Sequence, residues 1–258
     1  MPADTSPLPW RTDRDQLRSE MIKIRSARTL WLLPLIALVL GPLTAFFVGA
    51  TDSMEPADTV LGGAMTGLPL SLAVITAWGA LVVTTEFSTG TIRPVLSATP
   101  QRHVVLTAKA IVVGTVATVT GVGTTTAAAV IGDATIDATK YLPVPLFPGL
   151  LGIYACFPLV AWLGLAVGVM LRSSVGAVVV ATATVVLPQL SAAEAFGALH
   201  RWSTLMAPTA VVAKLSQSSD AATQLMGSLG GWPRLALVAA CALGAYLMAR
   251  RIFDRIDV

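Results

Sequence analysis

The sequence predicts an all-α, polytopic membrane protein with six transmembrane helices, and three observations support this. Only 12% of the 258 residues are charged, against about 25% in an ordinary soluble domain. Hydrophobic residues make up 55% of the chain. Six long intervals contain no charged residue: Thr29–Thr51, Thr59–Thr85, Ala110–Gly132, Tyr141–Leu171, Ser173–Ala193 and Leu235–Ala249.

The lengths of these intervals predict where the chain crosses the bilayer. A helix needs about 20 mainly apolar residues to span the hydrocarbon core. Five intervals reach that length directly, and the last one needs the residues at its two ends. We expect a single transmembrane domain over residues 1–258, with spans at about 30–51, 60–84, 106–131, 148–171, 174–192 and 233–249.

Residues 12–29, ahead of the first span, are predicted to form an amphipathic helix. Apolar side chains recur there at i, i+4 and i+7 on one helical face, and basic residues lie largely off that face. A short basic amphipathic helix beside a span is typical of the membrane interface. The alternative is a charged flank that only sets the topology. The residues of the expected interfacial helix are Leu17, Met21, Ile24, Arg25 and Arg28.

Lysine and arginine are unevenly divided between the two sides of the predicted bundle. If both termini are cytoplasmic, four of the 17 basic residues fall on the outer side and the other thirteen on the cytoplasmic side. Cytoplasmic loops of membrane proteins carry the excess of Lys and Arg, so we expect both termini to face the cytoplasm. The four outer residues are Lys140, Arg201, Lys214 and Arg234.

The connection at residues 193–232 is the largest outer loop of this topology. Apolar side chains at helical spacing predict one or two short, re-entrant helices that dip back into the outer interface. The residues that set this spacing are Phe196, Leu199, Trp202 and Met206.

The predicted span at residues 106–131 is rich in threonine. One interpretation is a polar lining for a transport pathway. The interpretation we favour is that the hydroxyl groups hydrogen-bond back to carbonyl groups of the preceding turn. The threonines are Thr115, Thr118, Thr120, Thr124, Thr125 and Thr126.

The sequence lacks the motifs of several enzyme and carrier classes. It contains no GxxxxGK[ST] loop to hold ATP phosphates, no HExxH and no GxSxG. His103 and His200 lie on opposite sides of the predicted membrane, and Cys156 and Cys241 lie within spans as expected free thiols. No ionisable residue lies in the middle of a span, where ion-coupled carriers keep such groups. We therefore expect no catalytic site, no metal site and no cofactor bound by this chain.

The connection at residues 85–105 is a polar stretch between two apolar blocks and reads TEFSTGTIRPVLSATPQRHVV. Pro94 and Pro100 should break it into short pieces, and Gly90 permits a tight turn. Glu86 stands where the preceding span ends. We expect its carboxylate to hold the turn by accepting hydrogen bonds from the segment or from a basic residue. The candidate donors are Gly90, Thr91 and Arg102.

The topology and this stretch together resemble the permease subunits of ABC-2 type transporters. The resemblance covers nearly the whole chain. Its most specific part is an order of residue types: Glu, then Gly-Thr, then Pro, a basic residue and a Lys that enters the next span. The residues that carry this pattern, with the neighbouring Arg93, are Glu86, Gly90, Thr91, Pro100, Arg102 and Lys109.

The resemblance implies a function and a set of partners. In that family the matching segment is a coupling helix that docks on a separate ATP-binding subunit, so ATP and magnesium would be bound by that partner. A second permease copy or homologue, a multi-pass location in the bacterial inner (plasma) membrane and no nucleic-acid partner are also implied. The expected activity is efflux of an amphipathic small molecule, drug, peptide or lipid. The chain lacks the large outer domain of bigger members, which argues against export of long polymers.

Two other functions stay open on the sequence. A non-transporting membrane anchor or sensor would have the same spans but no ATP-binding partner. A secondary carrier would need no partner either, but the absence of ionisable residues from the middle of the spans disfavours it.

Overall fold

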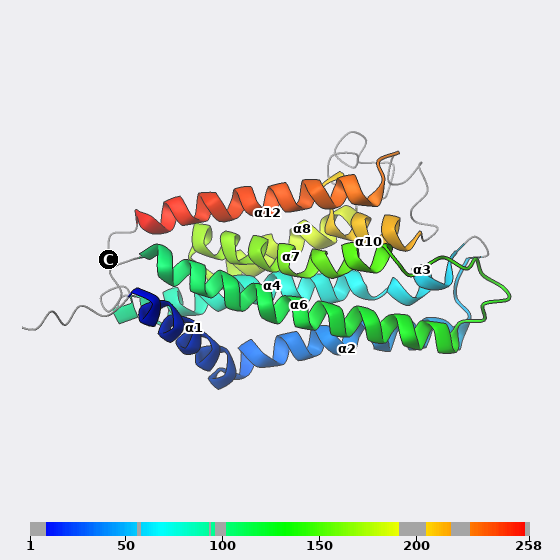
Figure 1. Cartoon of the computed structure of the whole chain (residues 1–258), viewed down its shortest axis with the longest axis horizontal. Coiled ribbons are helices and arrows are strands. Elements are labelled where there is room, and N and C mark those ends of the chain that lie inside the picture. Colours follow the sequence, from blue (N-terminus) through cyan, green and yellow to red (C-terminus); the bar gives the residue numbers. More distant parts are fainter. Residues whose placement is uncertain are drawn as a thin grey trace, which may run out of the picture.

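The computed structural model describes residues 9–55, 58–92, 94–95, 102–190, 205–217 and 228–255. Throughout these residues the chain forms helices joined by short connections, without a β-strand, so the all-α prediction is confirmed (Figure 1). The helices are α1 (Pro9–Ser26), α2 (Arg28–Thr51), α3 (Val60–Met65), α4 (Leu68–Ser88), α6 (Arg102–Thr135), α7 (Gly149–Leu171), α8 (Ser174–Leu190), α10 (Pro208–Ser216) and α12 (Gly231–Asp254).

The long helices run side by side along the long axis of the molecule (Figure 1). Helices α2 and α12 lie along opposite edges, and α1 slopes away from the end of α2. Of the most apolar stretch of α3–α4, 72% is buried, against 22% for α2 and 17% for α12. Helix α4 is therefore the central helix of the bundle, and the exposed apolar side chains of the edge helices form its outer surface.

The number of membrane spans is supported in part. Five stretches are long and apolar enough to cross a bilayer, judged by length and composition: α2, α3–α4, α6, α7 and α12. The predicted span 233–249 is longer than expected, because α12 continues through its arginines to Asp254. Helix α8, at the predicted span 174–192, falls short, since its apolar stretch is Ser174–Pro188. The protein is a polytopic helical membrane protein, and the count of six spans stays a prediction.

Helices α4 and α7 pack with their backbones in contact. A methyl group added at Gly164 would overlap the carbonyl oxygen of Thr76, and one added at Gly79 would overlap the carbonyl oxygen of Ala161. Only glycine permits such close approach of two helices. The contact fixes α4 against α7, and α4 carries Glu86 at its far end.

The connection at residues 193–232, which the sequence predicts as the outer loop, contains one described helix, α10, whose side chains are mostly buried. It is joined to α3 through Thr59, whose hydroxyl donates to the carbonyl oxygen of Ser216 at 2.7 Å and accepts from the amide of Gly62 at 2.9 Å. Phe196, Leu199 and Trp202 lie outside the described residues. The re-entrant position of this loop stays a prediction.

Two of the six threonines of α6 singled out above, Thr115 and Thr118, behave as the favoured interpretation requires. Thr115 and Thr118 donate to the carbonyl oxygens of the residues four positions earlier, each at 2.8 Å. The hydroxyl groups of Thr124 and Thr125 are buried and have no hydrogen-bond partner in the described part of the chain. Thr126 instead contacts the hydroxyl of a tyrosine on α7 at 2.9 Å. The favoured interpretation therefore holds for Thr115 and Thr118, and the choice between it and a polar pathway stays open for the other threonines.

Candidate functional site

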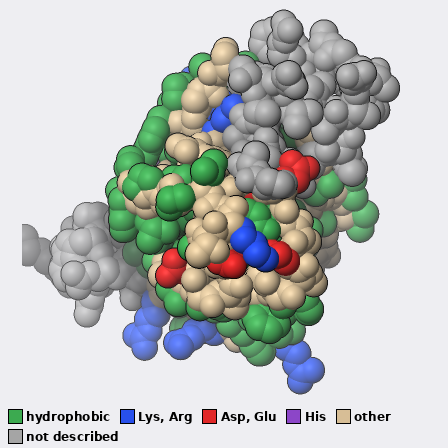
Figure 2. Space-filling model, turned by 90° about the vertical axis from the view of Figure 1, so that its right-hand side faces the viewer, with side chains coloured by type: hydrophobic (Ala, Val, Ile, Leu, Met, Phe, Trp, Pro, Cys, Tyr) green, Lys and Arg blue, Asp and Glu red, His purple; other side chains and the backbone are tan. Residues whose placement is uncertain are grey.

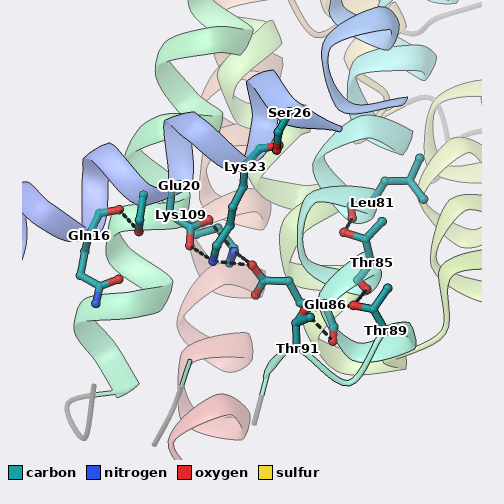
Figure 3. A network of polar contacts seen from close by, with 11 residues as sticks. Gln16, Glu20, Lys23, Ser26, Leu81, Thr85, Glu86, Thr89, Thr91 and Lys109 are labelled. Atoms are coloured by element: carbon teal, nitrogen blue, oxygen red, sulfur yellow. Dashed lines mark hydrogen bonds and ion pairs between the residues drawn. The ribbon is translucent and has the colours of Figure 1, made fainter. Parts of the chain in front are cut away.

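Four charged side chains from three helices meet at the end of the bundle where α4 ends and α6 begins (Figure 3). Glu20 and Lys23 come from α1, Glu86 comes from the last turn of α4, and Lys109 comes from the second turn of α6. We call these four residues the ion cluster. Two of its members, Glu20 and Lys109, are in contact although they lie 89 residues apart in the sequence.

Each lysine of the ion cluster contacts both carboxylates. The Lys109 Nζ atom lies 2.6 Å from Glu20 Oε2 and 2.8 Å from Glu86 Oε1. The Lys23 Nζ atom lies 2.7 Å from Glu20 Oε1 and 2.8 Å from Glu86 Oε1. Two cations and two anions alternate, so the cluster is neutral as a whole and each contact is a charge-assisted hydrogen bond.

Burial differs sharply between the two lysines. The Lys109 side chain is 1% exposed and the Glu20 side chain 2%, whereas Lys23 is 37% exposed. A buried charge is tolerated only when partners replace its lost hydration. Lys109 is therefore the inner member, whose removal would leave carboxylates buried without enough positive charge, and Lys23 closes the cluster from the surface.

The environment of Lys23, which lies outside the spans, stabilises its charged form. Burial lowers the pKa of Lys23, but hydrogen bonds to Glu20 and Glu86 outweigh burial and keep the pKa above its ordinary value of 10.5. Lys23 is therefore positively charged at neutral pH.

One carboxylate oxygen of the ion cluster, Glu86 Oε2, has no hydrogen-bond partner among the described residues. Glu86 Oε1 accepts from both lysines, while Glu86 Oε2 is buried. Buried polar atoms without partners are uncommon in folded proteins. Glu86 therefore keeps a spare acceptor at the head of the 85–105 segment.

The predicted donors to the Glu86 carboxylate are not the ones observed. The Gly90 amide donates to the Phe87 carbonyl at 3.3 Å, and the Thr91 hydroxyl reaches the backbone carbonyl of Glu86 at 3.5 Å. Arg102 donates to the carbonyl oxygen of Asp254, on α12, at 3.3 Å. A basic residue does hold Glu86, as expected, but it is Lys109 together with Lys23, because α1 brings its own charges to this end of the bundle.

The turn after α4 has the geometry that its glycine predicts. Gly90 has φ of +73°, in the left-handed region that glycine adopts without strain. The turn follows Ser88, the last residue of α4, and Gly90 lies four residues after Glu86. Arg93 and Pro100, the other expected members of the coupling segment, lie outside the described residues.

Glu20 was not predicted as a site residue, although its position in the sequence indicates a buried acid. Glu20 lies three residues after Leu17 and four before Ile24, so it is on the apolar face of α1. That face packs against the core of the bundle, and Ile24 is 5% exposed. An acid on a core-facing position requires a buried cation, and Lys109 is that cation. The placement of α1 at a membrane interface stays a prediction.

The helices and the charge distribution define a multi-pass membrane protein, and comparison with known families narrows the class. A protein-family model described as "ABC-2 family transporter protein" matches residues 16–188. Because the match covers well over half of the chain, the protein belongs to the ABC-2 transporter family and is a membrane permease component of an ABC transporter. No curated protein matches the sequence. The matched range contains all four residues of the ion cluster and ends before α10 and α12.

Proposed function

We propose that the protein is the membrane-spanning subunit of an ATP-driven exporter. A separate subunit hydrolyses ATP and docks on residues 85–105. Substrate, an amphipathic small molecule, drug, peptide or lipid, moves outward between this chain and a second permease copy or homologue. In this proposal the chain crosses the bacterial plasma membrane six times, and the ion cluster and both termini lie on the cytoplasmic side.

The observation that carries the proposal is the way in which the ion cluster holds both ends of the 85–105 segment. Glu86 lies at its beginning, and Lys109 lies four residues after its end. Their side chains are joined at 2.8 Å, and Glu20 ties the same lysine to α1. A force on the segment would therefore move α1, α4 and α6 together. This is the property that a lever between an ATPase and the transmembrane helices requires.

The cytoplasmic placement of this end rests on the positive-inside rule. Exposed arginines gather near it, among them Arg25 on α1, Arg172 after α7 and Arg251 on α12. Loops that remain in the cytoplasm carry this excess of basic residues. An ATP-binding partner, which needs cytoplasmic ATP, could reach the segment only from that side.

The test compares Glu86→Gln with the wild type, each co-expressed with its ATP-binding partner and reconstituted in liposomes. Hydrogen bonds to charged groups contribute roughly 1.5–3 kcal/mol. We expect the variant to insert and to retain the partner, while substrate-stimulated ATP hydrolysis and transport fall by roughly 10-fold to 100-fold. The matched control is Glu55→Gln, which removes an exposed carboxylate at the other end of the molecule.

Two outcomes would contradict the proposal in different ways. Wild-type transport by Glu86→Gln would remove the coupling role of the cluster but leave the transporter class intact. Failure to recover any ATP-binding subunit with the wild-type chain would instead favour a non-transporting membrane anchor or sensor.

A further inference from the structure

Helix α1 has two faces with different partners. Its inner face, which includes Leu17, Glu20 and Ile24, packs against the bundle and supplies half of the ion cluster. Its outer face is exposed. The residues of this outer face, with the first residue of α2, are Arg18, Ile22, Arg25 and Arg28. We call them the basic face.

The basic face combines positive charge with an exposed apolar side chain. Arg18, Ile22 and Arg25 follow one another at i, i+4 and i+7, so Ile22 lies between two arginines on one side of the helix. Ile22 is 56% exposed. On the first turn of α2, a few residues further along the chain, Trp31 is 42% exposed.

The arginines of the basic face have no anionic partner of their own. In the part of the chain that the structure describes, Arg18, Arg25 and Arg28 form no ion pair. Among residues 16–28 the acid, Glu20, is buried on the opposite face. Arginine matches phosphate oxygens with its planar fork of N–H donors. Three free guanidinium groups therefore present a surface complementary to phosphate.

We propose that the basic face binds the headgroups of anionic phospholipids. Phosphate groups pair with the arginines, and acyl chains cover Ile22 and the exposed start of α2. Helix α2 is apolar enough to span the membrane, so its first turn marks the level at which headgroups give way to acyl chains. An acidic protein surface would satisfy the arginines but would leave no reason for the exposed apolar side chain of Ile22 between two of them, or for exposed Trp31 on the first turn of α2.

The position of the basic face connects the lipid to the ion cluster. The same two turns of α1 carry Arg18, Ile22 and Arg25 outward and Glu20 and Lys23 into the cluster. A lipid that fixes the outer face would hold Glu20 and Lys23 against α4 and α6. The proposal concerns lipid binding, and it does not depend on the ATP-coupled export proposed above.

The experiment measures lipid binding by the purified chain in detergent, without an ATP-binding subunit. The probes are fluorescent phosphatidylglycerol and phosphatidylcholine, titrated into wild type, R18Q/R25Q/R28Q and R172Q/R250Q/R251Q. The second variant removes three exposed arginines from α12 and the turn after α7, so the loss of charge is matched. Helix content and elution volume establish that each variant is folded.

We expect wild type to prefer phosphatidylglycerol. Each arginine near an anionic surface contributes about 5-fold in affinity, so R18Q/R25Q/R28Q should bind phosphatidylglycerol about 100-fold more weakly. The control variant should retain its affinity within a few-fold. Raising the ionic strength should weaken binding to wild type, because salt screens exposed charges.

Three results would overturn the proposal. Equal loss of binding in the two triple variants would mean that net charge alone attracts the lipid. Equal affinity for phosphatidylcholine would exclude anionic headgroups as the ligand. Binding of glycerol 1-phosphate as tight as that of phosphatidylglycerol would show that the face takes free phosphate compounds and that the apolar residues beside it have no part.

Discussion

At one end of the bundle Lys109 joins Glu20 and Glu86 with 1% of its side chain exposed, and at the other end Lys140 joins Asp52 with 53% of its side chain exposed. The second contact is exposed on both sides. Figure 2 views the molecule from the right-hand side of Figure 1, and acidic and basic side chains lie at the surface there. The hydroxyl of Tyr141 also donates to Asp52, at 2.8 Å. At each end a lysine pairs with a carboxylate, and one further group joins the pair: a second carboxylate in the buried contact and the Tyr141 hydroxyl in the exposed one.

The difference shows why similar ion pairs have different consequences. Water solvates the exposed pair whether or not it forms, so its loss changes little. In the ion cluster the protein has replaced water, and removal of one partner leaves an opposite charge buried without compensation. The buried cluster also ties three helices together, whereas the exposed contact joins the end of α2 to the connection that follows α6. The ion cluster is therefore where a small change should alter the whole bundle.

The largest effect is expected from Lys109→Met. The substitution keeps the length of the side chain but removes the buried cation, so Glu20 and Glu86 are left with Lys23 alone. Breaking a buried ion pair from one side destabilises a protein by about 3–5 kcal/mol. The measurement is thermal and denaturant-induced unfolding in detergent.

The control for Lys109→Met is Lys140→Met, the same substitution in the exposed contact. A decrease in stability of equal size for both variants, or no decrease for Lys109→Met, would show that burial does not distinguish the two ends. Either result would also remove the physical basis for treating the ion cluster as a rigid joint.

An intermediate effect is expected from Lys23→Met. Lys23 contacts the same two carboxylates as Lys109, but its side chain is 37% exposed and water can take its place. We expect a loss of about 1–2 kcal/mol, smaller than that of Lys109→Met. The pKa of Lys23 in the folded protein lies above its ordinary value of 10.5. This contribution to stability is therefore complete at neutral pH, and it is lost only as the pH rises above 10.5 and through the pKa of the folded protein.

The comparison of Lys23→Met with Lys109→Met uses one unfolding assay at pH 7. The two lysines differ mainly in exposure, since their contacts to Glu20 and Glu86 are alike in length. If Lys23→Met proved the more destabilising variant, the inner and outer assignments of the two lysines would be wrong.

The sequence predicted the features of this protein that depend on local composition. Long charge-free intervals predicted the helices, because a helix that crosses a bilayer must satisfy its backbone internally and present apolar side chains. Glu86 and Lys109 were predicted as site residues from the resemblance to ABC-2 permeases, whose pattern of residue types includes both positions. Both were found in the ion cluster, although their coupling role stays a prediction.

The rest of the site could not be read from local patterns. Glu20 and Glu86 share Lys109 although they lie 89 and 23 residues from it in the sequence. No helical or strand period relates residues so far apart, and the pairing depends on how α1 docks on the bundle. The position of Glu20 on an apolar face indicated a buried partner, but it did not say which of the lysines or arginines that partner was.

The smallest effect is expected at the exposed contact, and its pH dependence sharpens the contrast. Hydrogen bonds from Lys140 and Tyr141 hold the pKa of Asp52 below its ordinary value of 3.8. The contribution of this carboxylate is therefore complete above its ordinary pKa and is lost as the pH falls through the lower value in the folded protein. Hydrogen bonding to Asp52 raises the pKa of Lys140 above 10.5 and that of Tyr141 above 10.0, so these two groups lose their contribution only at alkaline pH.

From about pH 5 to pH 9 we therefore expect the wild type, Asp52→Asn and Lys140→Met to melt at the same temperature within error. Below pH 3.8 the wild type should lose slightly more stability than Asp52→Asn, which has no carboxylate to protonate at this position. The measurement is thermal unfolding in detergent across this pH range. A decrease at pH 7 comparable to that of Lys109→Met would mean that the Asp52 contact holds its end of the bundle as firmly as the ion cluster holds the opposite end. The helices would then be held rigidly at both ends of the bundle, and a force on the 85–105 segment could not move them relative to one another at the opposite end.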